Sequence, residues 1–191
     1  MEFLLVGLGN PDPYIGTPHN IGKDFVMALV RHEKQRWSTI GGGKVSSVLV
    51  GSHLVACAVS DGYMNETGTG LADVLSHADP SRVLVVHDET DVPLGSAKVS
   101  YSRSSGGHKG VLSVEQTLGT KGFFRIRVGI GKHDNLAEYV LQQMSEETKT
   151  AIASALRQSF PEAIAKMVEH HRIPFSPQEI SSRHTDLSER V

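Results

Sequence analysis

The stretch FLLVGLGNPDPYIGTPHNIG, residues 3–22, decides how this chain begins to fold. It opens with the apolar run Phe3 to Val6, which predicts a buried strand because glycine and proline turn signals follow it at once. Four polar side chains come next, namely Asn10, Tyr14, His19 and Asn20. In open α/β sheets, ligands bind in the crevice beyond the carboxyl ends of the strands. The stretch therefore predicts a functional site near the start of the chain.

Helical and strand patterns alternate along the chain that follows. Residues 21–33 place apolar side chains at helical spacing, so the first strand leads through the polar loop into a helix. Residues 82–87 are the most strongly apolar strand, and Asp88 follows it. The other predicted strands are 44–50 and 53–59, which form a hairpin, then 97–102 at a sheet edge and 123–130, and the other predicted helices are 67–77 and 111–118. The alternation predicts an α/β fold.

The C-terminal part is predicted to be helical. One helix begins near Ser145, and residues 159–162 (SFPE) have the capping-box pattern with proline in the first turn, which predicts that another helix starts there. The last residues are polar and contain prolines, as frayed termini do. We therefore expect one domain over residues 1–172 and a polar tail over residues 173–191.

The composition is that of a globular protein and narrows the classes of function. Of the 191 residues, 39% are hydrophobic and 21% are charged, and the net charge is −2. This balance argues against a general nucleic-acid coat, which usually needs a strongly basic face, but it leaves a local phosphate site open. The single cysteine, Cys57, lies in an apolar run and is expected to be buried and inert. With no membrane-length apolar run and no signal-peptide pattern, we expect a cytoplasmic protein.

Four polar groups are predicted to meet at the strand ends. Asn10 and His19 follow the first strand, Asp88 ends the central strand, and Asn65 lies after the hairpin. A carboxylate beside an imidazole fixes the histidine tautomer and raises its basicity for general-base catalysis. Because no serine or cysteine nucleophile belongs to this set, water would be the attacking group, and asparagine side chains can position it. The set suits hydrolysis of an activated carbonyl such as an ester.

Sequence signatures of cofactor sites are missing. The turn around Gly7 and Gly9 lacks the third glycine of a dinucleotide-binding fingerprint, and no acidic residue ends an obvious second strand. The ten histidines show no zinc-ligand spacing. We therefore expect neither a metal ion nor another cofactor.

Five separated blocks of the sequence resemble bacterial-type peptidyl-tRNA hydrolases. The blocks are GLGNPDPYIGTPHNIG at 7–22, MN at 64–65 with Gly68, HDETDVPLG at 87–95, GGHKG at 106–110 and RIRVGIG at 125–131. The resemblance implies a single α/β domain with a mixed, twisted β-sheet flanked by helices. It also implies an enzyme that cleaves the ester bond between peptide and tRNA in peptidyl-tRNA, as a monomer without cofactor or protein partner.

The resemblance implies roles for individual residues. His19 resembles the catalytic base, Asp88 the carboxylate that orients it, and Asn10 and Asn65 the amides that hold substrate and water. The lining of the groove for the peptide and the 3′ adenosine would come from Tyr14, Met64 and His108, and the mobile lid from residues 132–143.

The tRNA side of the substrate needs a phosphate site. Lys98 and Arg127 stand where the family's clamp for the 5′-phosphate is expected. Lys109 stands where the family has an asparagine, and its ammonium group cannot accept a hydrogen bond but can contact a phosphate. Two further departures are Pro18, where the family commonly has arginine, and an Asn10-to-His19 spacing one residue shorter than expected.

Other interpretations of the same residues stay open at this point. Asp88 and Asn10 also suit turns, and Arg127 suits a solvated strand face. One alternative function is a catalytically weakened relative that acts as an RNA-binding protein, which Lys109 favours and the intact His19 and Asp88 disfavour. Another is a nucleoside- or peptide-processing hydrolase, which would be active without RNA.

Overall fold

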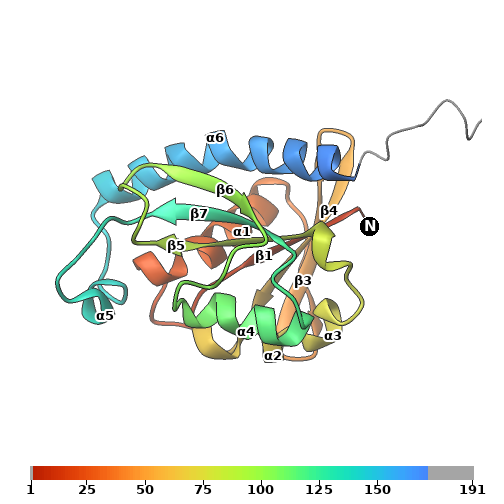
Figure 1. Cartoon of the computed structure of the whole chain (residues 1–191), viewed down its shortest axis with the longest axis horizontal. Coiled ribbons are helices and arrows are strands. Elements are labelled where there is room, and N and C mark those ends of the chain that lie inside the picture. The colour runs from red at the N-terminus through yellow and green to blue at the C-terminus, as the bar shows by residue number, and fades with distance from the viewer. Residues whose placement is uncertain (1, 172–191) are drawn as a thin grey trace, which may run out of the picture.

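The computed structural model describes residues 2–171, and its strands form one sheet (Figure 1). The strand order is β2-β3-β4-β1-β5-β7-β6. β4, β1, β5 and β7 run parallel to one another, whereas the pairs β2–β3, β3–β4 and β6–β7 are antiparallel. The bounds are Phe3–Gly7 (β1), Ser38–Ile40 (β2), Gly43–Val50 (β3), His53–Ser60 (β4), Val83–Glu89 (β5), Ala97–Tyr101 (β6) and Phe124–Gly129 (β7). The predicted mixed sheet is confirmed.

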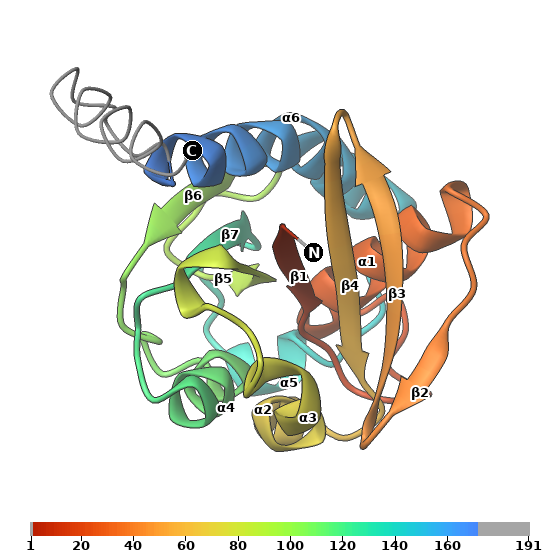
Figure 2. The same cartoon turned by 90° about the vertical axis from the view of Figure 1, so that its right-hand side faces the viewer.

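Helices cover both faces of this sheet (Figures 1 and 2). α1 (Ile21–His32) and α6 (Glu146–His170) lie on one face, and α2 (Thr67–Gly70), α3 (Ala72–Leu75) and α4 (Lys109–Leu118) lie on the other. Short 3-10 helices occur at Pro18–Asn20 (η1), Met64–Glu66 (η2) and Pro80–Arg82 (η3). The prediction of a single α/β domain flanked by helices is confirmed.

β1 lies in the middle of the sheet and is buried along its whole length. Its side chains alternate between the two faces, as in any strand. Phe3 and Leu5 belong to the core that includes residues of α1 and α6, whereas Leu4 and Val6 belong to the core formed with α3 and α4. A strand that is buried on both faces requires a continuous apolar run, which explains the opening FLLV.

The prediction of a separate helix starting at Ser159 is wrong. α6 runs unbroken through Pro161, and its N-cap is Ser145, whose Oγ accepts a hydrogen bond from the Thr148 N–H at 3.1 Å. Ser159 is buried and its hydroxyl caps nothing in residues 2–171. Phe160 and its apolar neighbours pack into the core on either side of the proline. This packing outweighs the local helix-start pattern and the loss of one helical hydrogen bond at proline.

Smaller departures concern the ends and the exposure of elements. The predicted helix 67–77 is split near Leu71 into α2 and α3. β7 is buried on both faces and does not alternate between buried and exposed residues. Two short elements were not expected from the sequence. They are β2, whose three residues are all exposed, and α5 (Leu136–Tyr139).

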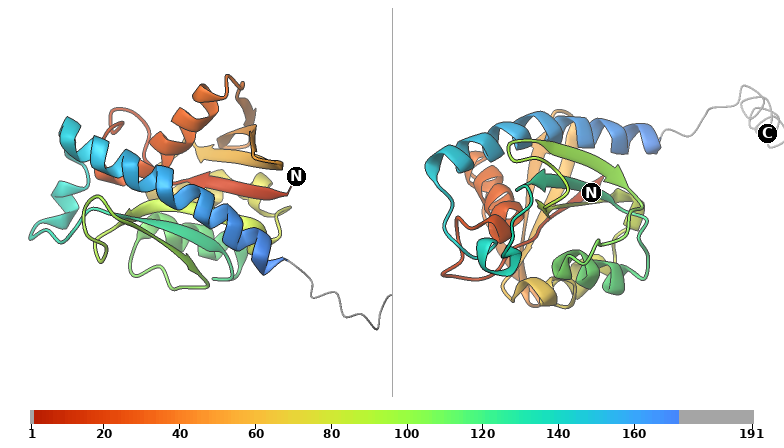
Figure 3. Two further views of the ribbon diagram at one scale, coloured as in Figure 1. Left: turned by 90° about the horizontal axis from the view of Figure 1, so that it is seen from above. Right: turned by 60° about the vertical axis from the view of Figure 1, so that its left-hand side comes forward.

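α5 stands apart from the two helical layers, beyond the carboxyl ends of the parallel strands (Figure 3). It belongs to the segment that was expected to form the lid, residues 132–143. The sequence-predicted tail, residues 173–191, lies outside the described residues. None of the helices in residues 2–171 has the length and apolar character that crossing a bilayer requires.

α1 packs against β1 and β5 at backbone distance. A Cβ atom at Gly22 would overlap the carbonyl oxygen of Val86, and one at Gly7 would overlap the carbonyl oxygen of Gly22. Around this contact the Leu8 N–H donates to Val86 O at 3.1 Å, and the Lys23 N–H donates to Leu8 O at 2.8 Å. The two glycines therefore fix the start of α1, and the loop before it, directly beside the central strands.

Replacing Gly22 by alanine should destabilise the fold by about 1–3 kcal/mol or more, because the added methyl group forces α1 away from Val86. Helix propensity alone would favour alanine by about 1 kcal/mol, so the expected sign is opposite to propensity. Denaturant unfolding measures the change. The control is Ala28→Gly at an exposed position of the same helix, which should lose no more than about 1 kcal/mol. A Gly22→Ala variant as stable as the parent would refute the close-contact argument.

Candidate active site

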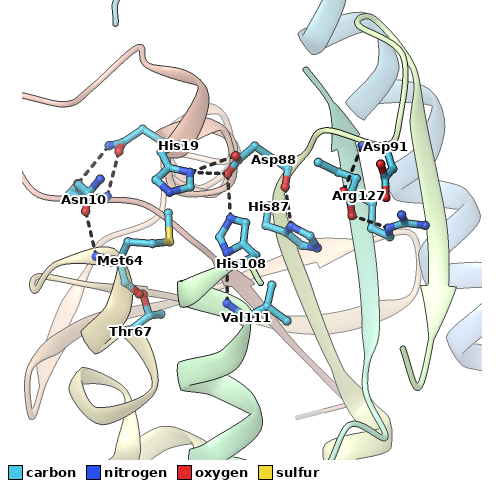
Figure 4. A network of polar contacts seen from close by, with 12 residues as sticks. Asn10, His19, Met64, Thr67, His87, Asp88, Asp91, His108, Val111 and Arg127 are labelled. Carbon is cyan, nitrogen blue, oxygen red and sulfur yellow. Dashed lines mark hydrogen bonds and ion pairs between the residues drawn. The ribbon is translucent and has the colours of Figure 1, made fainter. Parts of the chain in front are cut away.

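Asp88, near the C-terminal end of β5, accepts hydrogen bonds from two imidazoles (Figure 4). His19 Nδ1 lies 2.9 Å from Asp88 Oδ1 and 3.0 Å from Oδ2, and His108 Nε2 lies 2.9 Å from Oδ1. The carboxylate is only 5% exposed, whereas the His19 side chain is 21% exposed. The structure thus brings together three residues predicted for the site, while their roles stay a prediction.

The hydrogen bonds determine which ring nitrogens carry protons. The N–H of Val111 donates to His108 Nδ1 at 3.3 Å, with His108 as the N-cap of α4. His108 Nδ1 is therefore an acceptor, so the proton is on Nε2 and is donated to Asp88. The Nδ1 N–H of His19 likewise donates to the carboxylate, so Nε2 is the His19 nitrogen that is not engaged with Asp88.

Asp88 is held in its charged form. Burial by itself would raise the pKa of Asp88, but the electrostatic attraction of the neighbouring His108 ring and the N–H donors of both imidazoles outweigh it, so the pKa lies well below its usual range. The neighbouring His87 is fully buried, and its Nδ1 donates to the backbone carbonyl of Asp88 at 2.7 Å. Burial lowers the pKa of His87 well below its ordinary value, so this ring stays neutral. His87 is therefore a buried neutral ring that binds the backbone of Asp88.

The side-chain amide of Asn10 is oriented by a backbone group across the site. Its Oδ1 accepts a hydrogen bond from the N–H of Met64 at 2.9 Å (Figure 4). Because the oxygen is occupied in this way, the amide NH₂ is free to donate to another group. The Asn10 backbone is fixed by the side chain of Asn20, which accepts from Asn10 N at 2.9 Å and donates to Asn10 O at 3.0 Å.

His19 is also held through its backbone. It lies in η1 between Asn10 and α1, and its N–H donates to the carbonyl of Val140 at 3.0 Å. The next residues of the C-terminal segment bind the same loop: Gln143 Nε2 donates to Ile15 O at 2.9 Å, and Met144 N donates to Gly16 O at 3.1 Å. The segment around α5 therefore closes over the loop that carries His19.

These residues line a cavity of about 630 Å³. Its polar wall includes Asn10, His19, Asn65, Asp88, His108 and Lys109, and its floor includes the buried Met64. An apolar wall comes from Leu136, Ala137, Val140 and Leu141 at α5. The cavity therefore combines imidazole groups and the two side-chain amides of Asn10 and Asn65 with an apolar surface from α5 and the residues after it.

Three predicted substrate-binding residues do not line this cavity. Tyr14 is partly buried in the loop before η1. Lys98 is exposed on β6 and stands directly opposite Arg127 on β7. Arg127 is only 7% exposed, and its Nε forms an ion pair with Glu89 at 2.9 Å. The expected phosphate clamp thus pairs an exposed lysine with an arginine that already has a carboxylate partner.

Two residues that shape the site were not assigned a role from the sequence. Asn20 is fully buried and fixes the backbone of Asn10, and its place beside His19 in the opening stretch is the signal that could have found it. Lys23 is buried near the same loop, and its Nζ donates to Asn10 O at 3.3 Å. No sequence pattern distinguishes this lysine from one on a solvated helix face.

The same three side chains have the composition of a metal site, since atoms of His19, Asp88 and His108 lie within 4.8 Å of one another. A metal ligand must offer a lone pair, however, and the His108 nitrogen that faces Asp88 carries a proton as long as Val111 donates to the other nitrogen. The donor pattern therefore fits proton transfer better than metal binding.

Comparisons with known proteins show which family this chain is similar to. Peptidyl-tRNA hydrolase of Saccharophagus degradans is 38% identical over 167 residues, covering 83% of this chain and 85% of the relative. The enzyme of the same name from Thermodesulfovibrio yellowstonii is 34% identical over 163 residues, covering 82% and 87%.

Solved structures show the same fold. That of peptidyl-tRNA hydrolase from Acinetobacter baumannii superimposes with a TM-score of 0.74 over 86% of this chain and 93% of that one, at 23% identity. A sequence model of the family described as peptidyl-tRNA hydrolase matches residues 4–185. The chain therefore belongs to the peptidyl-tRNA hydrolase family.

Proposed function

We propose that this protein hydrolyses the ester bond between the peptide and the tRNA of peptidyl-tRNA, with His19 as the general base. The observation that carries the mechanism is the hydrogen bond of His19 Nδ1 to the buried carboxylate of Asp88, because it leaves Nε2 as the ring nitrogen that can exchange a proton in the cavity. Family membership supports the substrate class.

The reaction needs only groups that the site contains. His19 Nε2 takes a proton from water as the water oxygen attacks the ester carbonyl, and Asp88 stabilises the imidazolium that forms. The amide NH₂ of Asn10 is free to donate to the attacking water or the developing oxyanion. The tetrahedral intermediate then releases the ribose oxygen, which takes the proton back from His19. The products are a peptide with a free carboxylate and a tRNA with a free 3′-terminal hydroxyl.

The two ends of the substrate require different surfaces. The apolar wall at α5 suits the peptide, and Asn65, Met64 and His108 suit the 3′ adenosine. Lys109, exposed at the start of α4, and Lys98 with Arg127 on the β6–β7 edge suit phosphates of the tRNA. Tyr14, which does not line the cavity, is proposed to contact substrate only outside it.

Release of tRNA from an N-blocked aminoacyl-tRNA by the purified protein tests this function. Binding without turnover would favour the alternative of a catalytically weakened, RNA-binding relative. Turnover of ester substrates that lack RNA at the same rate would favour a nucleoside- or peptide-processing hydrolase. We further propose that the enzyme acts in the cytoplasm, as a monomer and without a protein partner.

His19→Ala should lower turnover by roughly 10²- to 10⁴-fold with little change in substrate binding, because the positioned base is lost. Asp88→Asn should lower it less, since the imidazole remains but loses the negative charge that stabilises its protonated form. Steady-state kinetics on N-blocked aminoacyl-tRNA measures both effects. His32→Ala is the control, because the side chain of His32 is 84% exposed. A larger loss for Asp88→Asn than for His19→Ala would make the carboxylate the base.

Lys98→Gln should weaken binding of tRNA substrates that carry a 5′-phosphate and leave short aminoacyl-adenosine fragments nearly unaffected. Arg127→Gln should do the same and should also destabilise the protein, because Glu89 loses its buried partner. Inhibition constants of the two substrate types, with a melting curve for each variant, separate these effects. Lys121→Gln, at an exposed lysine in the loop before β7, serves as control. Equal losses on both substrates would assign the pair a structural role.

Lys109→Asn should make substrate affinity less dependent on salt, because removing a lysine that contacts phosphate reduces the number of counterions released on binding. A contact with one phosphate corresponds to a change of about 0.7–0.9 in the slope of log K against log salt. Affinity measured across a salt series for both proteins provides the comparison. Identical slopes would show that Lys109 touches no phosphate.

A further inference from the structure

Lys23, in the first turn of α1, is a buried cation behind the candidate active site. It is 9% exposed, and its Nζ donates to the carbonyl of Ser60 at 2.7 Å and to the carbonyl of Asn10 at 3.3 Å. Its stem passes directly over Gly9, where a Cβ atom would overlap the Cβ of Lys23. The lysine is therefore fitted to the loop that follows β1.

The two carbonyls lie where the β1–β4 ladder ends. The last paired residues are Gly7 in β1 and Val59 in β4, and beyond them the two segments separate. The segment after β1 continues to Asn10, and the end of β4 continues through Ser60 to η2, which begins at Met64. The ammonium group of Lys23 binds both segments where they separate. It therefore connects them beyond the last backbone pair of β1 and β4, on the side of the cavity.

The same two segments meet again through the side chain of Asn10. Its Oδ1 accepts from the N–H of Met64, and Asn20 already supplies hydrogen bonds to the Asn10 backbone. What Asn20 does not supply is a connection to β4, since it binds only the loop after β1. Lys23 alone among these side chains spans from Asn10 to Ser60.

A charged side chain is an unfavourable choice for filling this space. Burial lowers the pKa of Lys23, and the charge of Asp61 acts in the opposite direction. A methionine of similar length would fill the volume without the desolvation of an ammonium group. Methionine could not, however, donate to two carbonyl oxygens, and Ser60 O would lose the donor that Lys23 provides.

We propose that Lys23 is a positioning residue for the hydrolysis: it clamps the loop after β1 to the end of β4 and so sets the amide of Asn10 relative to His19. The inference rests on the proposed function of the site. Lys23 touches no substrate in this scheme and acts through Asn10. Misplacement of a catalytic group by about 1 Å can lower turnover by up to 10²-fold, so the effect of losing the clamp is measurable.

The test is a double-mutant cycle of Lys23→Met and Asn10→Ala, with kcat and KM measured on N-blocked aminoacyl-tRNA. Lys23→Met should lower kcat roughly 10- to 100-fold in the parent protein. In the Asn10→Ala background the same change should lower kcat by no more than about twofold, because the group that Lys23 positions is already gone. Equal losses in both backgrounds, or an unchanged kcat for Lys23→Met, would overturn the proposal.

The matched control is Lys44→Met on β3. Its side chain is 44% exposed and lies 3.4 Å from Asp61, the same carboxylate that influences Lys23, so it tests the removal of a nearby charge without removal of the clamp. It should leave kcat unchanged. If Lys23→Met does not fold, Lys23→Gln goes through the same cycle and is judged by the same criteria, because its amide nitrogen ends one bond short of the position of Lys23 Nζ and so loses the contact with both carbonyls. Turnover by the parent and by Lys44→Met tests the proposed function separately, whatever the Lys23 variants do.

Discussion

A buried carboxylate that must be satisfied by hydrogen-bond donors is the constraint on which this structure depends. Asp88 is buried on a strand whose first four residues are apolar, and an isolated charge there would be strongly unfavourable. Its two imidazole donors come from different parts of the chain, His19 from η1 after β1 and His108 from the N-cap of α4. The sheet, the loop after β1 and α4 must therefore all be in their native positions before the negative charge of Asp88 is compensated.

Each donor is itself fixed by the element that carries it. The N–H of Val111, in the first turn of α4, keeps the His108 proton on the side that faces Asp88. His19 is held close to the sheet because α1 approaches the backbone of β5 at Gly22. The close contact of Gly22 with the carbonyl of Val86 thus helps to determine where the imidazole of His19 lies. The site is preorganised by the core and not by contacts among the catalytic groups alone.

The sequence predicted the parts of this arrangement that depend on local pattern. The run FLLV identified the central strand because a strand buried on both faces needs continuous apolar residues, and the strand-end rule pointed to His19 and Asp88 together. Ser159 and Pro161 led to the wrong prediction of a helix start. The helix continues through them because Phe160 packs into the core. The ion pair of Arg127 with Glu89 and the burial of Lys23 involve partners distant in sequence, so no short-range pattern reveals them.

The hydrogen bond from the His19 N–H to the carbonyl of Val140 joins a loop made early in synthesis to a segment made late. While the chain is emerging from the ribosome, β1 and its loop can be present for a long time before residues 140–144 are available to bind them. The loop that carries His19 gains these backbone partners only after the whole sheet has been synthesised, since β7 ends at Gly129. A nascent chain that has not grown past α5 therefore lacks the backbone partners that hold the candidate site in place.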